Sequence, residues 1–207
     1  MTTANEAALD AFVTLIADKG FAEVALRDVA EAAGLTLAEL YRLYPDKVAL
    51  AAAFLAKIDG EVLGGTPSGS DPEETARDRL FDAMMRRYDA MRPHRKALAE
   101  VRRAATRDPL LALALGPAVR RSMAAVLEAA AIPSDGLAGA VRQNGLLAIH
   151  YAVSRVYDQD DTTDLSKTMA ALDGRLKSAE KWVQLFDKYG KSRTAREPVD
   201  EVNSPAA

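Results

Sequence analysis

The chain has 207 residues, of which 49% are apolar and 6% aromatic, and Ala and Leu outnumber the β-branched residues. This composition favours an all-α protein without a sheet, and the length allows a buried core without covalent cross-links. The sequence contains no cysteine, which excludes disulfides, thiolate metal sites and cysteine nucleophiles.

The formal net charge of −3 is unevenly distributed along the chain. Residues 1–58 contain five Lys or Arg and eight Asp or Glu, whereas residues 86–107 contain eight Lys or Arg and two Asp or Glu. The N-terminal residues lack a signal-peptide pattern, and we expect no stretch with the roughly 18 apolar residues that a membrane-spanning helix needs. The sequence therefore predicts a cytoplasmic protein.

The first predicted helices lie close together in the chain. Apolar residues recur with helical spacing over 5–19, and a second short helix fits 26–33. Thr36 and Glu39 have the spacing of a capping box, which opens a third helix that ends before Pro45. A short helix, a turn and another short helix are typical of the helix-turn-helix arrangement, whose second helix enters the major groove of DNA.

Longer helices are predicted in the rest of the chain. Asp46 caps a helix to about residue 62, and a flexible loop follows over 64–70. Asp71 and Pro72 are the residue types of a helix start, with a capping carboxylate and a proline at the first helical position. Further helices are expected over 93–105, over 109–130 with a kink or break near Pro117, over 135–157 and over 165–186, and a polar tail follows Tyr189.

The residues around the predicted turn match a known family pattern. Gly20-Phe21, the run from Leu26 to Leu35, Leu40-Tyr41-Arg42 and the run from Pro45 to Leu50 resemble the N-terminal domain of TetR-type regulators. The resemblance implies a dimeric transcriptional regulator that binds double-stranded operator DNA. It also implies a TetR-like fold with a helix-turn-helix DNA-binding domain over 1–62, a helical ligand-binding and dimerisation domain over 71–189 and a disordered tail over 190–207.

The same resemblance indicates which residues contact DNA. Thr36, Tyr41 and Lys47 would contact phosphates, and residues 37, 38 and 42 would lie near base edges. The full implied set is Arg27, Thr36, Leu37, Ala38, Tyr41, Arg42 and Lys47. The chain departs from the family pattern at Leu37, Glu39 and Leu43, where small polar residues and a His or Tyr are usual.

Three of these positions have alternative interpretations. Glu39 is either the carboxylate of the capping box or an acceptor for a cytosine amino group. Lys47 is either a phosphate ligand or a solvated lysine at a helix start. Tyr41 could equally belong to the core.

A second resemblance covers residues 158–176. It rests on Asp161, Thr162, Asp164, Thr168, Leu172, Asp173 and Arg175, and it points to the ubiquinone-biosynthesis lipid-binding proteins, which share the TetR-like fold but have lost DNA binding. This resemblance implies an alternative function as a lipid-binding accessory protein of ubiquinone biosynthesis. Ordinary helix-start chemistry also explains the segment, with Asp164 as a cap and with Asp173 and Arg175 on a solvated face.

The predicted larger domain offers a dimer interface and a ligand cavity. We expect a homodimer through helices 137–157 and 165–186, the first with small residues at Gly145, Ala148 and Ala152 and the second with an apolar stripe. Either face could instead serve its own subunit's core. An apolar small molecule or a lipid would bind among the helices, against Met84, Tyr88, Met91, Met123, Leu146, His150 and Tyr151.

The remaining charged and polar residues do not form a pattern typical of an enzyme. The basic residues of 86–103 form either a solvated helix face or a docking surface for an acidic protein or an anionic membrane. The two histidines are far apart in the sequence, and no phosphate-binding loop or nucleophile motif occurs. We therefore expect no catalytic residues, no metal and no cofactor.

Overall fold

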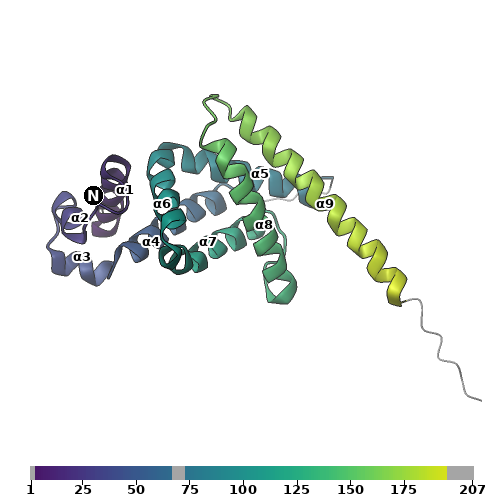
Figure 1. The fold of residues 1–207 in the computed structure, drawn as a ribbon, viewed down its shortest axis with the longest axis horizontal. Coiled ribbons are helices and arrows are strands. Elements are labelled where there is room, and N and C mark those ends of the chain that lie inside the picture. Colours follow the sequence, from purple (N-terminus) through teal and green to yellow (C-terminus); the bar gives the residue numbers. More distant parts are fainter. Residues whose placement is uncertain (1–2, 67–72, 195–207) are drawn as a thin grey trace, which may run out of the picture.

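The computed structural model of the chain describes residues 3–66 and 73–194, with side-chain environments up to residue 180. All regular elements in these residues are helical, as the composition predicts. They are α1 (Ala4–Lys19), α2 (Leu26–Ala32), α3 (Leu37–Leu43), α4 (Lys47–Gly64), α5 (Ala76–Met91), a 3-10 turn (Arg92–His94), α6 (Arg95–Arg107), α7 (Pro109–Ala129), α8 (Gly136–Tyr157) and α9 (Ser166–Thr194). Figure 1 shows α1 to α3 gathered at one end, α4 running from them into the other helices, and the long α9 along the opposite side.

Polar side chains cap the starts of α1, α3 and α4. The Thr3 and Thr36 hydroxyls accept from the backbone N–H groups of Glu6 and Glu39, and each glutamate side chain accepts from the threonine N–H in return. Asp46 Oδ1 accepts from Ala49 N at 2.7 Å at the start of α4. These reciprocal bonds satisfy donors that a helix start otherwise leaves free.

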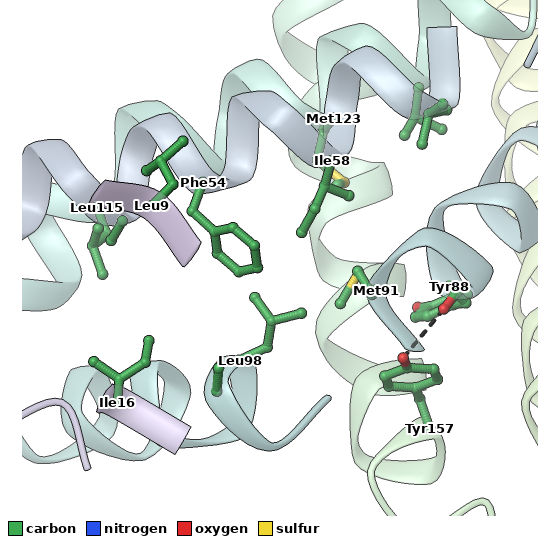
Figure 2. Packing of buried hydrophobic residues seen from close by; sticks show 14 of the residues in the cluster. Leu9, Ile16, Phe54, Ile58, Tyr88, Met91, Leu98, Leu115, Met123 and Tyr157 are labelled. Atoms are coloured by element: carbon green, nitrogen blue, oxygen red, sulfur yellow. Dashed lines mark hydrogen bonds between the residues drawn. The ribbon is translucent and has the colours of Figure 1, made fainter. Parts of the chain in front are cut away.

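The buried core connects the N-terminal helices to the rest of the molecule. Phe54 of α4 and Leu98 of α6 point toward one another in Figure 2, near Leu9 and Ile16 of α1. Further along α4, Ile58 lies beside Met123 of α7. Helix α4 packs most extensively on α7, and α1 packs on α6, so α4 belongs to the packing of both ends of the molecule.

Several predicted boundaries differ from the structure. Helix α5 begins at Ala76, where Thr75 Oγ1 accepts from Asp78 N at 3.2 Å, so the predicted start at Asp71 is wrong. Residues 67–72 lie outside the described residues, as do 195–207 of the predicted tail. Helix α7 runs unbroken through Pro117, and α9 continues to Thr194 rather than ending near Phe186.

Helix α7 is the part of the described chain that bears on the prediction about membrane-spanning stretches, although Arg120 and Arg121 interrupt its apolar residues. Pro109–Ala129 is long and apolar enough to cross a membrane by length and composition alone. A core helix of a soluble protein passes the same test. The extensive packing of α7 on α4 is consistent with a helix that packs within the protein.

Candidate nucleic-acid interface and ligand cavity

Helices α2 and α3 are held as a helix-turn-helix unit by two buried side chains and a turn. Val29 and Leu40 are both fully buried, one on each helix, and they join the core cluster. In the turn, Gly34 has φ of +69°, a conformation that a residue with a Cβ rarely adopts. The N–H groups of Gly34 and Leu35 donate to carbonyls of α2, and this bonding fixes the direction in which α3 leaves the turn.

One exposed surface of this unit gathers five of the seven predicted DNA-contacting residues. Leu37 and Tyr41 on α3 are 43% and 60% exposed, so Tyr41 is not a core residue. Arg42 Nε donates to Ala38 O at 3.2 Å, which keeps the guanidinium close to α3. We call this surface, which surrounds a shallow hollow beside Leu26, the recognition surface; its residues are Arg27, Leu37, Ala38, Tyr41 and Arg42.

The other two predicted contacts, Thr36 and Lys47, are engaged within the protein. The Thr36 hydroxyl donates to Glu39 Oε2 at 2.7 Å, and the Thr36 N–H donates to the same oxygen at 2.8 Å. These two bonds hold the pKa of Glu39 below its usual value. The capping interpretation of Glu39 is confirmed, and the Thr36 hydroxyl proton would have to leave Glu39 to meet a phosphate.

Lys47 is a structural link as well as a basic residue. Its Nζ donates to Phe21 O at 2.9 Å and to Ala22 O at 3.2 Å, and it lies 5.0 Å from the centre of the Phe21 ring. Partial burial lowers its pKa. The lysine therefore fastens the start of α4 to the segment between α1 and α2, and one of its three N–H donors remains available.

A cavity of about 970 Å³ lies among α4, α5, α6, α7 and α8. Of the seven predicted ligand contacts, Met91, His150 and Tyr151 line it. Met84, Tyr88, Met123 and Leu146 are instead buried in the core and are not among its lining residues. The wall also contains residues that the sequence analysis did not propose as ligand contacts, among them Leu55, Arg87, Leu98, Arg102, Arg103, Leu115, Val119, Ser154, Arg155 and Asp158.

Two lining residues of the cavity, Arg87 and His150, make polar contacts with residues of other helices. Arg87, which is 1% exposed, pairs with Asp59 of α4, and Ser122 Oγ of α7 donates to the same carboxylate at 2.7 Å. Tyr88 Oη lies 3.2 Å from His150 Nδ1. Burial lowers the pKa of His150 to about 3, with a smaller contribution from the charges of Arg87 and Arg102, so the ring is neutral at physiological pH.

The comparisons with known proteins match this arrangement. The family profile described as "Bacterial regulatory proteins, tetR family" matches residues 8–54, which contain the whole helix-turn-helix unit. The profile match therefore covers α1 to α3 and the first part of α4, and it does not extend over the larger helical part. No curated protein matches the chain at a significant level.

Solved structures show that the remaining helices follow the TetR-type fold. A TetR transcriptional regulator from Nitrosomonas europaea is 21% identical, with a TM-score of 0.68 over 85% of this chain and 97% of that chain. A TetR transcriptional regulator from Rhodococcus sp. RHA1 is 22% identical, with a TM-score of 0.60 over 84% and 96%. GusR of Salmonella enterica is 17% identical, with a TM-score of 0.55 over 84% and 95%.

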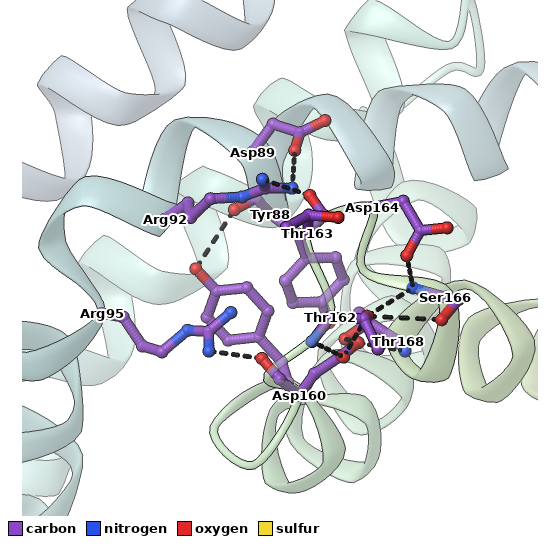
Figure 3. Close-up of polar contacts among 11 residues, drawn as sticks. Tyr88, Asp89, Arg92, Arg95, Asp160, Thr162, Thr163, Asp164, Ser166 and Thr168 are labelled. Carbon is purple, nitrogen blue, oxygen red and sulfur yellow. Dashed lines mark hydrogen bonds and ion pairs between the residues drawn. The ribbon is translucent and has the colours of Figure 1, made fainter.

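In this TetR-type fold, a buried carboxylate organises the joint between α8 and α9 (Figure 3). Asp160 is fully buried and accepts from the N–H groups and hydroxyls of Thr162 and Thr168. Arg95 donates to Asp160 O at 2.6 Å, and Arg92 donates to Thr163 O at 2.6 Å. Burial alone would raise the pKa of Asp160, but the threonine hydrogen bonds outweigh it and hold that pKa well below its usual value.

These contacts account for much of segment 158–176 through helix-start chemistry. Asp164 Oδ1 accepts from Ser166 N at 3.1 Å, as the capping interpretation predicts. Asp173 is not simply solvated, because it pairs with Arg77 of α5 and with Lys177. Arg175 is exposed.

The basic run 86–103 is largely engaged within the molecule. Arg87 pairs with Asp59, Arg102 with Asp158, and Arg103 with Glu100, while Arg92 and Arg95 reach the α8–α9 joint. Neither a wholly solvated face nor a free basic patch describes this run.

The two helices expected to form the dimer interface differ in which of their apolar residues are exposed. Leu165, just before α9, and Leu172 and Leu176 on α9 are buried in the subunit's own core, whereas the predicted stripe beyond residue 180 lies outside the described side chains. Helix α8 instead presents an exposed row, with Leu137 86%, Val141 65% and Tyr151 51% exposed. We call this row the α8 stripe; its residues are Leu137, Val141, Asn144, Ala148 and Tyr151, all exposed.

Proposed function

We propose that this protein is a dimeric TetR-type transcriptional regulator whose affinity for operator DNA responds to a small molecule in the cavity. The observation that carries the proposal is the exposure of five predicted DNA contacts on one recognition surface of a TetR-family domain. The recognition helix α3 would enter the major groove, and Arg27 and Arg42 would contact phosphates or base edges. Such a regulator acts in the cytoplasm.

The α8 stripe supports the dimer. Its members are spaced four and three residues apart, the spacing of a helix that packs along a nearly parallel or antiparallel partner. Exposed Leu137 and Val141 would be buried by a second copy of the same helix, and Ala148 allows close approach. A two-fold dimer presents two recognition surfaces at a fixed separation, which operator half-sites must match.

Helix α4 supports the response to a ligand. Its first residue, Lys47, is tied to the segment before α2, its middle residue Leu55 lines the cavity, and Asp59 pairs with Arg87 of the cavity wall. A ligand that moves Leu55 or Arg87 would therefore tilt α4 and change the separation of the two recognition surfaces.

The DNA-binding proposal is tested by selection from genomic fragments followed by a salt titration. We expect the purified protein to retain a palindromic fragment, with affinity that falls steeply as salt rises. Arg42→Ala should weaken binding to all fragments or relax selectivity at one position. If Arg27 binds a phosphate, Arg27→Ala should lower the salt slope by about 1. Arg121→Ala, an exposed arginine on α7, is the matched control. Retention of no fragment even at low salt would overturn the proposal.

The dimer is tested separately by mass measurement in solution. Val141→Glu should give a monomer, because two added charges would face each other across the α8 stripe. Leu113→Glu makes the same change at a residue on α7 that is 75% exposed and outside that stripe. A dimer that survives Val141→Glu would show that the interface lies elsewhere.

A further inference from the structure

The cavity wall contains both hydrogen-bond donors and apolar side chains. Its described lining includes four arginines and one carboxylate, that of Asp158. Arg155 makes no ion pair with the described residues, whereas Arg87, Arg102 and Arg103 each pair with a different carboxylate. The apolar lining residues include Leu55, Met91, Leu98, Leu115 and Val119.

Two buried polar atoms in this wall lack a partner of good geometry. Ser154 is 2% exposed, and its Oγ makes no hydrogen bond with the described residues. Burial raises the pKa of the nearby Tyr88 phenol, and Ser154 offsets part of that rise. Arg87 Nε is also without an acceptor among the described residues. A buried polar atom left unpaired costs about 1–3 kcal/mol, so a ligand that brings acceptors here would recover that loss.

The neighbouring histidine extends the set of donors. The Tyr88 hydroxyl, 3.2 Å from His150 Nδ1, can donate to that nitrogen, which leaves Nε2–H as the donor of a neutral ring. The charges of Arg87 and Arg102 help to lower the pKa of His150, so the ring lies in a region of positive potential. A negative ligand group would be favoured in the same region.

We propose that the cavity binds an amphipathic organic anion, a carboxylate on an apolar body. The carboxylate would lie against Arg87, Arg102 and Ser154, and the body would lie against the leucines and Val119. An entirely apolar ligand would leave Ser154 Oγ and Arg87 Nε unpaired. This inference rests on the proposed ligand-responsive regulator and names the chemical class of its ligand.

Asp158 makes the proposal testable in both directions. It lines the cavity and pairs with Arg102, so its carboxylate occupies the guanidinium that a ligand carboxylate would use. Removing the charge of Asp158 should tighten the binding of an anion. A purely structural role for the pair predicts the opposite, because an unpaired Arg102 would loosen the joint between α6 and α8.

The experiment is calorimetry on the purified protein without DNA, using decanoate, decanol and decylamine, which share one alkyl chain. Decanoate should bind about tenfold more tightly than decanol, since hydrogen bonds to a charged group are the stronger ones, and decylamine should bind most weakly. Asp158→Asn should tighten decanoate severalfold, Ser154→Ala and Arg102→Gln should weaken it, and Arg120→Gln, outside the lining, should leave it unchanged.

The proposal would be overturned if decanoate and decanol bound equally well. It would also be overturned if Asp158→Asn bound decanoate more weakly while its circular dichroism and melting temperature matched those of the parent protein. The two proposals fail separately. A protein that selects a DNA fragment but shows no preference for the anion keeps the regulator function and loses this ligand class. A protein that prefers decanoate but retains no DNA keeps the ligand class and loses the regulator function.

Discussion

The two ends of the molecule use side-chain hydrogen bonds in different ways. In the N-terminal helices most of these bonds join residues three positions apart, as between Thr36 and Glu39 or between Asp46 and Ala49. The larger part also has local bonds of this kind, and in addition it has several that join residues far apart in the chain, as between Asp59 and Arg87 or between Arg95 and Asp160. The first kind defines where each helix begins, and the second kind fixes how the helices lie against one another.

This difference predicts that the two ends respond differently to mutation. A helix cap contributes about 1 kcal/mol and its loss stays local, whereas removing one partner of a buried ion pair leaves an uncompensated charge in the core. Helix α4 contains both kinds, because Asp46 caps its start and Asp59 pairs with buried Arg87 near its end. Mutations along this one helix therefore compare the two directly.

The largest expected effect is at Asp59. Asp59→Asn should lower the free energy of unfolding by about 3–5 kcal/mol, because Arg87 would stay charged and buried without a carboxylate. The double variant Asp59→Asn with Arg87→Met should recover much of this loss, since it removes both charges. Urea denaturation followed by circular dichroism measures both, and the control is Lys57→Met, which breaks an exposed pair with Asp10 and should cost less than about 1 kcal/mol. A double variant no more stable than the single one would contradict this account.

A somewhat smaller effect is expected at Asp160. Asp160→Asn should cost about 3 kcal/mol, because a buried carboxylate that accepts from two threonines is replaced by an amide that cannot accept at both oxygens. Since the pKa of Asp160 is lowered in the folded protein, its contribution is complete above the unfolded value of about 4 and is lost as the pH falls below it. Melting temperatures between pH 5 and pH 2 should fall less steeply in the variant than in the parent protein. Asp135→Asn, at an exposed residue whose side chain makes no cap hydrogen bond at the start of α8, should behave like the parent protein.

The same division explains what the sequence can predict. The capping box of Thr36 and Glu39, the turn at Gly34 and the exposed face of α3 depend on residues close in the chain, and each is predicted or implied by local patterns. The wall of the cavity cannot be predicted in this way. Helical spacing predicts that methionines and aromatic residues line the cavity, but Met84 and Met123 pack into the core. Arg87 and Arg102, which do line it, come from a basic run that the sequence suggests is a surface feature.

The error at α5 has the same cause. Asp71 and Pro72 form a plausible start when only local residue types are considered, yet the helix begins at the cap Thr75. Arg79 donates to Glu74 O and to Ala130 O at the end of α7, so a contact between distant helices holds the chain just before the true start. No pattern within the segment indicates that contact.

The third prediction concerns the pH dependence of the larger part. His150 has a lowered pKa in the folded protein, about 3, so below pH 6.5 the unfolded chain binds a proton that the folded chain does not. Stability should therefore fall on acidification, by about 2 kcal/mol between pH 6.5 and pH 5 for this one group. His150→Gln should remove that part of the slope, as measured by urea denaturation at several pH values. Asp160→Asn is the comparison, because it should alter the loss of stability at lower pH. If the dependence of stability on pH were the same in His150→Gln as in the parent protein, His150 would be protonated in the folded protein.

The smallest expected effect is at Glu39 on the N-terminal side, where the question is DNA affinity rather than folding. Glu39→Gln keeps the acceptor that the capping box needs, so the helix content should stay the same. Because a negative charge beside the recognition surface is removed, affinity for every DNA fragment should rise, by about threefold. The measurement is a binding titration at fixed salt, and Glu61→Gln, at the far end of α4, is the control.

The direction of the change at Glu39 separates the two interpretations of this residue. If the carboxylate also accepts from a cytosine amino group, Glu39→Gln would weaken binding to the selected fragment and leave non-specific DNA less affected. If it acts through the cap alone, both kinds of DNA should bind more tightly. The cap uses Oε2 for both of its hydrogen bonds with Thr36, so Oε1 is the atom through which a base contact would have to occur, and only the comparison of specific with non-specific DNA can reveal it.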